Sequence, residues 1–119
     1  MSFLFADSSP LTVKNSFIVE EGSPADFLCT VNEPITECSF EIFDETYSVT
    51  EDSDNDEFKY FGRSFNDGDC GITIKNMTTS YLGRYRNKCF VNTKNGRKNL
   101  EGHIYLLLYQ VRNIIIFHL

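Results

Sequence analysis

The chain of 119 residues has no tryptophan and only two methionines, three prolines and two histidines. His103 and His118 lie far from the four cysteines, and no two cysteines form a Cys-x-x-Cys pair, so zinc-site spacing is missing. There is also no Gly-x-Ser-x-Gly elbow, no metal triad and no phosphate-binding loop. We therefore expect a protein that is not an enzyme and that holds no metal and no cofactor.

Long apolar segments are missing as well. A helix that crosses a membrane needs about 20 apolar residues, and the apolar tail from residue 104 to 119 is interrupted by Gln110, Arg112 and Asn113. A secretory signal needs about 7–15 apolar residues after a basic start, whereas residues 1–6 are followed at once by Asp7. We expect no membrane span in this chain, no signal peptide is evident, and residues 1–10 are interpreted as a remnant of a signal or a linker.

What the sequence does contain is enough apolar surface for one core, with 41% hydrophobic residues, eleven phenylalanines and six tyrosines. Apolar and polar residues alternate with a period of two in short segments separated by turn residues, which is typical of β-strands. The dipeptide Asn95-Gly96 between two apolar runs indicates a hairpin. The expected strands cover about residues 11–20, 26–31, 38–43, 47–50, 58–60, 70–75, 84–91 and 100–109.

The four cysteines, Cys29, Cys38, Cys70 and Cys89, fall on the apolar side of four different predicted strands. An even number of cysteines in a small β-rich chain indicates two disulfides and an oxidising compartment, and four cysteines allow three pairings. Their placement suits bridges between two packed sheets. The sequence Asn76-Met77-Thr78 is an acceptor for N-glycosylation, which agrees with secretion.

The order of these features resembles the immunoglobulin superfamily. Cys29 follows a Glu-Gly turn and Phe27, as the strand-B cysteine of that family does, and Phe40 stands where the family has its buried strand-C tryptophan. The segment from Cys70 to Met77 is similar to strand E, and Gly83-Arg-Tyr85 followed by Cys89 is similar to the start of strand F.

This resemblance implies an all-β fold, a two-sheet antiparallel immunoglobulin-like sandwich with Greek-key topology. It covers residues 11–110, and residues 111–119 would be an apolar C-terminal tail, truncated or alternatively spliced. It also selects the pairings Cys29–Cys89 and Cys38–Cys70, with the second pair on strands C and E as in some invertebrate members. The sequence departs from the family at Tyr85, which is four residues before Cys89, so that Asn87 takes an inward position and needs partners there.

Charge is segregated along the chain. Residues 1–70 hold sixteen acids and three bases, a net of −13, while residues 71–119 hold eight bases and one acid, a net of +7. Arg84, Arg86 and Lys88 share the outward side of the predicted strand F. A protein-binding role is one interpretation of this stripe, and pairing of Arg86 or Arg84 with Glu41 on the neighbouring strand is the other. The acidic total and the disulfides argue against nucleic acid as the partner.

Aromatic residues on the same sheet favour a binding surface. Phe43, Phe90 and Tyr105 are expected to point outward together with the basic stripe, and exposed aromatics beside arginines are typical of interfaces. The alternative is that the tail or an additional strand covers this face.

The acidic run from Glu51 to Glu57 suggests calcium at first sight. Asp52, Asp54 and Asp56 have the spacing of the first EF-hand ligands, but Glu57 stands where that loop needs glycine and Arg63 where it needs glutamate. We interpret the run as a solvated loop.

These features together predict an extracellular module, secreted or part of a surface protein, that recognises or adheres to a protein ligand, a receptor or a second copy of itself. One alternative is a small secreted binder or immune-type effector that acts as a single domain. Another is a cytosolic sandwich with reduced thiols.

Overall fold

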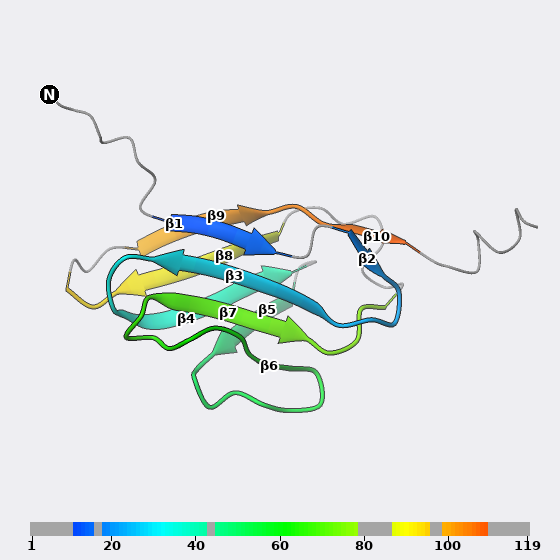
Figure 1. Ribbon diagram of the computed structural model, residues 1–119, viewed down its shortest axis with the longest axis horizontal. Coiled ribbons are helices and arrows are strands. Elements are labelled where there is room, and N and C mark those ends of the chain that lie inside the picture. The colour runs from blue at the N-terminus through cyan, green and yellow to red at the C-terminus, as the bar shows by residue number, and fades with distance from the viewer. Residues whose placement is uncertain (1–10, 16–17, 43–44, 79–86, 96–98, 110–119) are drawn as a thin grey trace, which may run out of the picture.

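The computed structural model describes residues 11–15, 18–42, 45–78, 87–95 and 99–109 (Figure 1). All regular structure in these ranges is β-strand, so the expected all-β class is confirmed. The strands form two four-stranded antiparallel sheets and one short parallel pair.

The first sheet has the order β1-β3-β7-β6, and every neighbouring pair in it is antiparallel. Its central strands are far apart in the sequence, because the chain enters the other sheet after β3 and returns to β6 and β7 later. The strands are β1 (Leu11–Asn15), β3 (Ala25–Val31), β7 (Asp69–Ile74) and β6 (Phe58–Tyr60).

The second sheet has the order β5-β4-β8-β9 and is also antiparallel throughout. The predicted hairpin around Asn95 is present as the antiparallel pair of β8 and β9, with Asn92 opposite Asn99. The strands are β5 (Glu45–Val49), β4 (Ile35–Ile42), β8 (Asn87–Thr93) and β9 (Asn99–Ile104).

The third sheet corrects two expectations. Residues 11–20 were expected to form one strand, but β1 ends at Asn15 and β2 (Ile18–Glu20) pairs elsewhere. Residues 100–109 were likewise expected to form one strand, but β9 ends at Ile104 and β10 (Leu107–Tyr109) pairs with β2 in parallel. The chain therefore pairs with β8 along β9 and with β2 along β10. The expectation that all strands pair antiparallel was wrong for β2 and β10.

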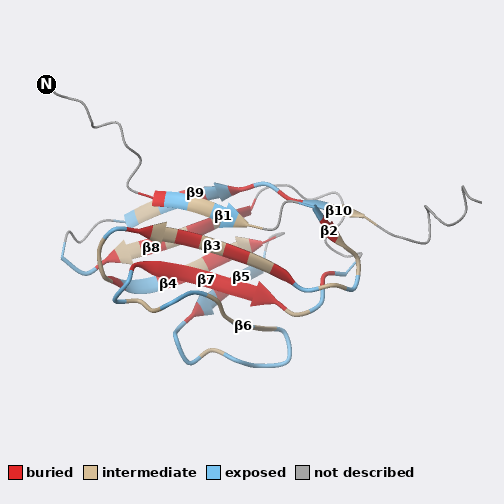
Figure 2. Ribbon diagram, in the orientation of Figure 1, coloured by how far each residue is buried: buried red, intermediate tan, exposed pale blue. Residues whose placement is uncertain are grey.

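The core lies between the two four-stranded sheets. β3 and β8 alternate between buried and half-buried residues, as strands with one face in a core and one face outward should (Figure 2). β7 is different, because all six of its residues are buried. Phe27, Phe40, Ile42, Ile72 and Val91 are among the fully buried side chains.

Two disulfides join the sheets across this core: Cys29 on β3 bonds to Cys89 on β8, and Cys38 on β4 bonds to Cys70 on β7. These are the two pairings that the resemblance implied. Each bridge taken alone would contribute roughly 4 kcal/mol by the loop-entropy estimate, and the nested pair less than the sum. Phe40 is fully buried directly opposite Cys89, so it fills the place beside the bridge that was expected for it.

Asn87, the first residue of β8, is only 2% exposed, so the expected inward position of this polar side chain is confirmed. Tyr85 lies outside the described residues, and its expected place at the start of the strand stays a prediction.

Candidate binding surface

The outward face of the second sheet is the surface on which the sequence placed its candidate residues. Alternation along each strand turns one side chain in two away from the core, and the cross-strand register aligns these side chains in rows. The outward set in the described strands is Glu37, Ser39, Glu41, Thr46, Ser48, Lys88, Phe90, Asn92, Asn99, Glu101 and His103.

Phe90 is the one large apolar side chain in this outward set. It lies on β8 opposite Ser39 of β4 and Glu101 of β9, and it is half-buried among these neighbours. The expected outward direction of Phe90 is therefore confirmed. A half-buried aromatic ring with polar neighbours can act as an anchor for a partner that covers the sheet.

Lys88 is the one lysine or arginine of the outward set, and it lies beside acidic side chains. Its Nζ lies 3.4 Å from a carboxylate oxygen of Glu101, which is also 3.7 Å from Nε2 of His103. The register places Lys88, not Arg86 or Arg84, opposite Glu41. Arg86 and Arg84 lie outside the described residues, so their pairing with Glu41 stays a prediction.

Several candidates lie outside the described residues, namely Arg84, Arg86 and Phe43. Within the described part of the sheet, the outward set holds three carboxylates and Lys88 as its one lysine, so this part of the face is acidic rather than basic. Glu37 is tied to its neighbour strand, because Nδ2 of Asn92 donates to its carboxylate.

Exposed apolar side chains lie close to the junction between β9 and β10. Tyr105 lies between these strands and is 67% exposed, as the sequence predicted. Ile18 and Leu107 face each other across the parallel pair and are 60% and 53% exposed. Sequence reasoning missed these two residues, because it treated residues 11–20 and residues 100–109 each as one strand with a single parity.

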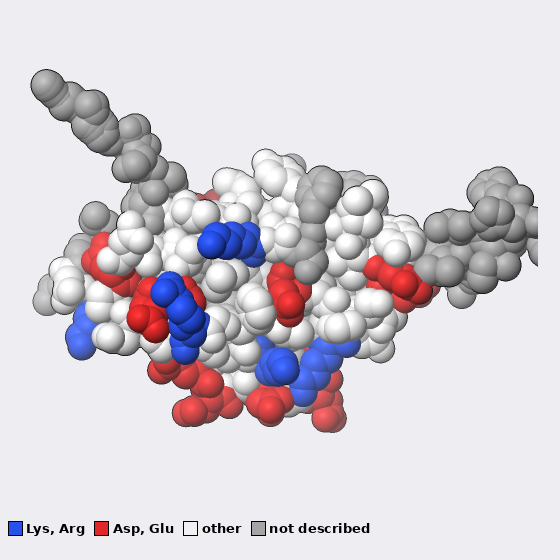
Figure 3. Space-filling model, viewed as in Figure 1, with Lys and Arg blue, Asp and Glu red and all other residues white. Residues whose placement is uncertain are grey.

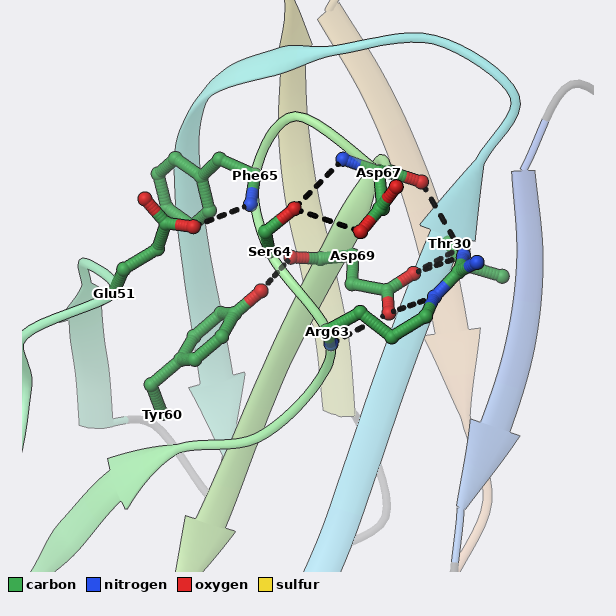
Figure 4. Close-up of polar contacts among 8 residues, drawn as sticks. All are labelled: Thr30, Glu51, Tyr60, Arg63, Ser64, Phe65, Asp67 and Asp69. Carbon is green, nitrogen blue, oxygen red and sulfur yellow. Dashed lines mark hydrogen bonds and ion pairs between the residues drawn. The ribbon is translucent and has the colours of Figure 1, made fainter.

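In the β1-β3-β7-β6 sheet, polar contacts hold the connection between β6 and β7 in place (Figure 4). We call the cluster of Thr30, Tyr60, Arg63 and Asp69 the latch. The buried carboxylate of Asp69 accepts hydrogen bonds from Oγ1 of Thr30 at 2.7 Å and from the amide, Nε and Nη2 of Arg63 at 2.8, 2.9 and 3.0 Å. The hydroxyl of Tyr60 donates to the carbonyl of Asp69 at 2.7 Å. These contacts fold the connection over the end of β7.

Hydrogen bonds, burial and charge within the latch shift the pKa values of Asp69 and Tyr60 in opposite directions. Hydrogen bonds from Arg63 lower the pKa of Asp69 to about 2 although burial opposes them, and the hydrogen bond from Thr30 adds to the shift. Burial, followed by the negative charge of Asp69, raises the pKa of Tyr60 above its ordinary value. The connection also explains why β7 is buried on both faces: a Cβ at Gly71 would lie 1.9 Å from the carbonyl oxygen of Phe61.

The acidic run is a folded loop at the edge that holds β6, where acidic and basic side chains lie side by side (Figure 3). Nζ of Lys75 lies 2.8 Å from Oδ1 of Asp54 and lowers the pKa of that carboxyl. The Asn55 side chain accepts from the amides of Glu57 and Phe58 at 2.8 and 3.0 Å. No group of three or more potential ligands for a metal ion occurs among the residues that the structure describes.

The sequon follows β7. Asn76 and Thr78 are exposed, whereas Met77 between them is fully buried. The Met77 amide donates to the carbonyl of Ser23 at 3.1 Å and its carbonyl accepts from Gly22 at 2.6 Å. The backbone is thus fixed with both sequon side chains toward solvent.

Comparisons with known proteins add no family to these observations: no family model and no curated protein matches the chain. In the described ranges there is also no helix with the length and apolar character that a membrane crossing requires.

Proposed function

We propose that the chain is an extracellular protein-recognition or adhesion domain of the immunoglobulin superfamily type. The observation that carries the proposal is the order of the strands. When the strands are lettered along the chain as in that family, the first sheet, β1-β3-β7-β6, has the strand order A, B, E, D. The second sheet, β5-β4-β8-β9, has the strand order C′, C, F, G. Cys29–Cys89 then takes the place of the bridge between strands B and F.

Two further features support an extracellular location. Structural disulfides persist in oxidising compartments and are rare in the cytosol, and all four cysteines of this chain are paired. The acceptor Asn76 is exposed next to a fixed backbone, so an oligosaccharide on it would meet solvent. Such a glycan would lie at the end of β7, on the first sheet, and would leave the outward face of the second sheet free.

Recognition is assigned to the outward face of the β5-β4-β8-β9 sheet. Phe90 supplies an apolar centre there, and the charged residues around it, Glu41, Lys88 and Glu101, lie where rim charges steer encounter more than they add affinity. The partner is a protein ligand, a receptor or a second copy of the chain, and we propose neither nucleic acid nor a membrane as partner.

The test uses the disulfide-intact protein. Sedimentation velocity at increasing protein concentration measures self-association. In a second assay the protein is immobilised on beads and incubated with increasing amounts of extracellular proteins from its source, and the amount of protein bound is measured. Saturable binding in either assay supports recognition. A monomer that binds none of these proteins contradicts the proposal, as does a cytosolic native protein with four free thiols.

A further inference from the structure

A surface hollow lies on the outward face of the β5-β4-β8-β9 sheet, where β4 and β5 run side by side. Its volume is about 320 Å³, which is within the range of sites that hold small ligands. Two small side chains, Ser39 and Ser48, lie directly opposite each other there. The polar residues that line the hollow are Thr36, Glu37, Ser39, Ser48 and Thr50, and none of the described lysines, arginines or histidines lines it.

The hollow holds acceptor atoms that the protein itself does not use. Neither the Ser39 hydroxyl nor the Ser48 hydroxyl has a hydrogen-bond partner among the described residues. Glu37 has no cationic partner in that part of the chain either, because Nζ of Lys88 lies 3.4 Å from the carboxylate of Glu101 instead. A ligand that enters therefore meets a negative charge and two open hydroxyl oxygens.

The neighbouring strand β8 positions the carboxylate and adds an aromatic ring. Asn92 lies opposite Glu37, and its Nδ2 donates to Oε1, which leaves Oε2 without a partner among the described residues. A carboxylate that is already held in place loses less conformational freedom when a ligand binds. Phe90 lies opposite Ser39, so its half-buried ring is next to the hollow.

From this arrangement we propose that the hollow binds the guanidinium group of an arginine on the protein partner. A guanidinium has five N–H donors in a planar fork and no acceptor, which matches a carboxylate beside open hydroxyl oxygens. Its flat face stacks on aromatic rings, and Phe90 supplies such a ring at the edge of the hollow. The identity of the partner rests on the proposed function, whereas binding of a guanidinium group does not.

A lysine or a neutral sugar matches the same hollow less well. The ammonium group of lysine is a strongly hydrated point charge and does not form the two parallel bonds that a guanidinium makes with a carboxylate. A sugar offers hydroxyls, but the outward set of this face carries three carboxylates against one lysine, so the local field favours a cation over a neutral ligand.

The experiment uses the isotope-labelled, disulfide-intact protein and small probes, so that no partner is needed. The probes are N-acetyl-arginine amide, the uncharged but similarly shaped N-acetyl-citrulline amide, and N-acetyl-lysine amide. Amide chemical shifts measured by NMR during each titration report where a probe binds and how tightly. The arginine probe should shift the amides of Ser39, Ser48 and Phe90 with a dissociation constant in the millimolar range, the lysine probe should bind about threefold or more weakly, and the citrulline probe should give no saturable shift.

Three variants separate the charge from the ring. Glu37→Gln should weaken binding of the arginine probe by about threefold or more, and the difference from wild type should shrink in high salt. Glu57→Gln removes one exposed negative charge from the acidic loop, outside the hollow, and should leave the affinity unchanged. Phe90→Leu keeps an apolar side chain but loses the face of the ring, and it should weaken binding by about twofold or more.

The proposal is overturned if no probe shifts these amides, if the citrulline probe binds as tightly as the arginine probe, or if Glu57→Gln weakens binding as much as Glu37→Gln. Methyl glucoside is titrated in parallel, and tighter binding of this sugar would make the hollow a carbohydrate site instead. Because the titrations contain no partner, their failure leaves the binding assays of the proposed function untouched. A hollow that binds the arginine probe on a protein that binds no partner would overturn the proposed function alone.

Discussion

Asp69 offers the sharpest test of what holds the connection between β6 and β7 in place. Its carboxylate is buried and accepts four hydrogen bonds, three of them from Arg63 and one from Thr30. In Asp69→Asn the charge is lost, and one of the two acceptor oxygens becomes an amide donor that faces other donors. Breaking such a set should lower the free energy of unfolding by about 2–3 kcal/mol at neutral pH.

The pH dependence of this loss follows from the pKa of Asp69. The folded pKa is lowered to about 2 from an ordinary 3.8, so the carboxylate stabilises the fold above the ordinary value, and this contribution is lost as pH falls through the folded one. The difference corresponds to about 2 kcal/mol, and to less in high salt because Arg63 is largely exposed. Wild type and Asp69→Asn should therefore approach each other in stability between about pH 5 and pH 2.

Urea unfolding of the disulfide-intact protein, followed by far-ultraviolet circular dichroism, measures both effects, since the chain has no tryptophan for fluorescence. The matched control is Asp67→Asn, an exposed position that bonds to Ser64 and should lose less than about 1 kcal/mol. The reasoning fails if the two variants lose the same stability at pH 7, or if the gap between wild type and Asp69→Asn is constant with pH.

Three further outcomes follow from single contacts. Gly71→Ala should lower the free energy of unfolding by about 2 kcal/mol or more in the same urea assay, because the added methyl meets the carbonyl of Phe61; a neutral effect would contradict this packing. In protein secreted from eukaryotic cells, Asn76→Gln should remove a glycosidase-sensitive mass that Thr78→Ser retains, and equal masses for wild type and Asn76→Gln would refute glycosylation. Titration calorimetry should show no micromolar calcium binding, and such binding that disappears in Asp54→Asn would contradict our interpretation of the acidic loop.

The parity of the strands could be read from the sequence. A period of two is a local property, so the inward positions of Cys29, Phe40 and Cys89 and the outward position of Phe90 follow from neighbouring residues alone. The pairing of the cysteines required more, because parity leaves three pairings open and only the family resemblance chose between them.

Features that depend on distant segments could not be read in this way. Which residue of β8 lies opposite Glu41 depends on the register between β4 and β8, and the exposure of Ile18 depends on its pairing with Leu107. The burial of both faces of β7 arises where the connection from β6 crosses Gly71. In each case a contact between residues far apart in the sequence decides the outcome, and alternation within one strand carries no signal of it.

The central claim, that the outward face of the β5-β4-β8-β9 sheet recognises a partner, is tested by one pair of truncations. Phe90→Ala removes a half-buried apolar side chain from this face, and Leu28→Ala removes one from the outward face of β3 in the opposite sheet. The measurement is the dissociation constant of each variant for whichever partner, or second copy, the wild type binds. We predict that Phe90→Ala weakens binding by about 1–3 kcal/mol while Leu28→Ala leaves it unchanged, and binding that depends on Leu28 but not on Phe90 would contradict the account.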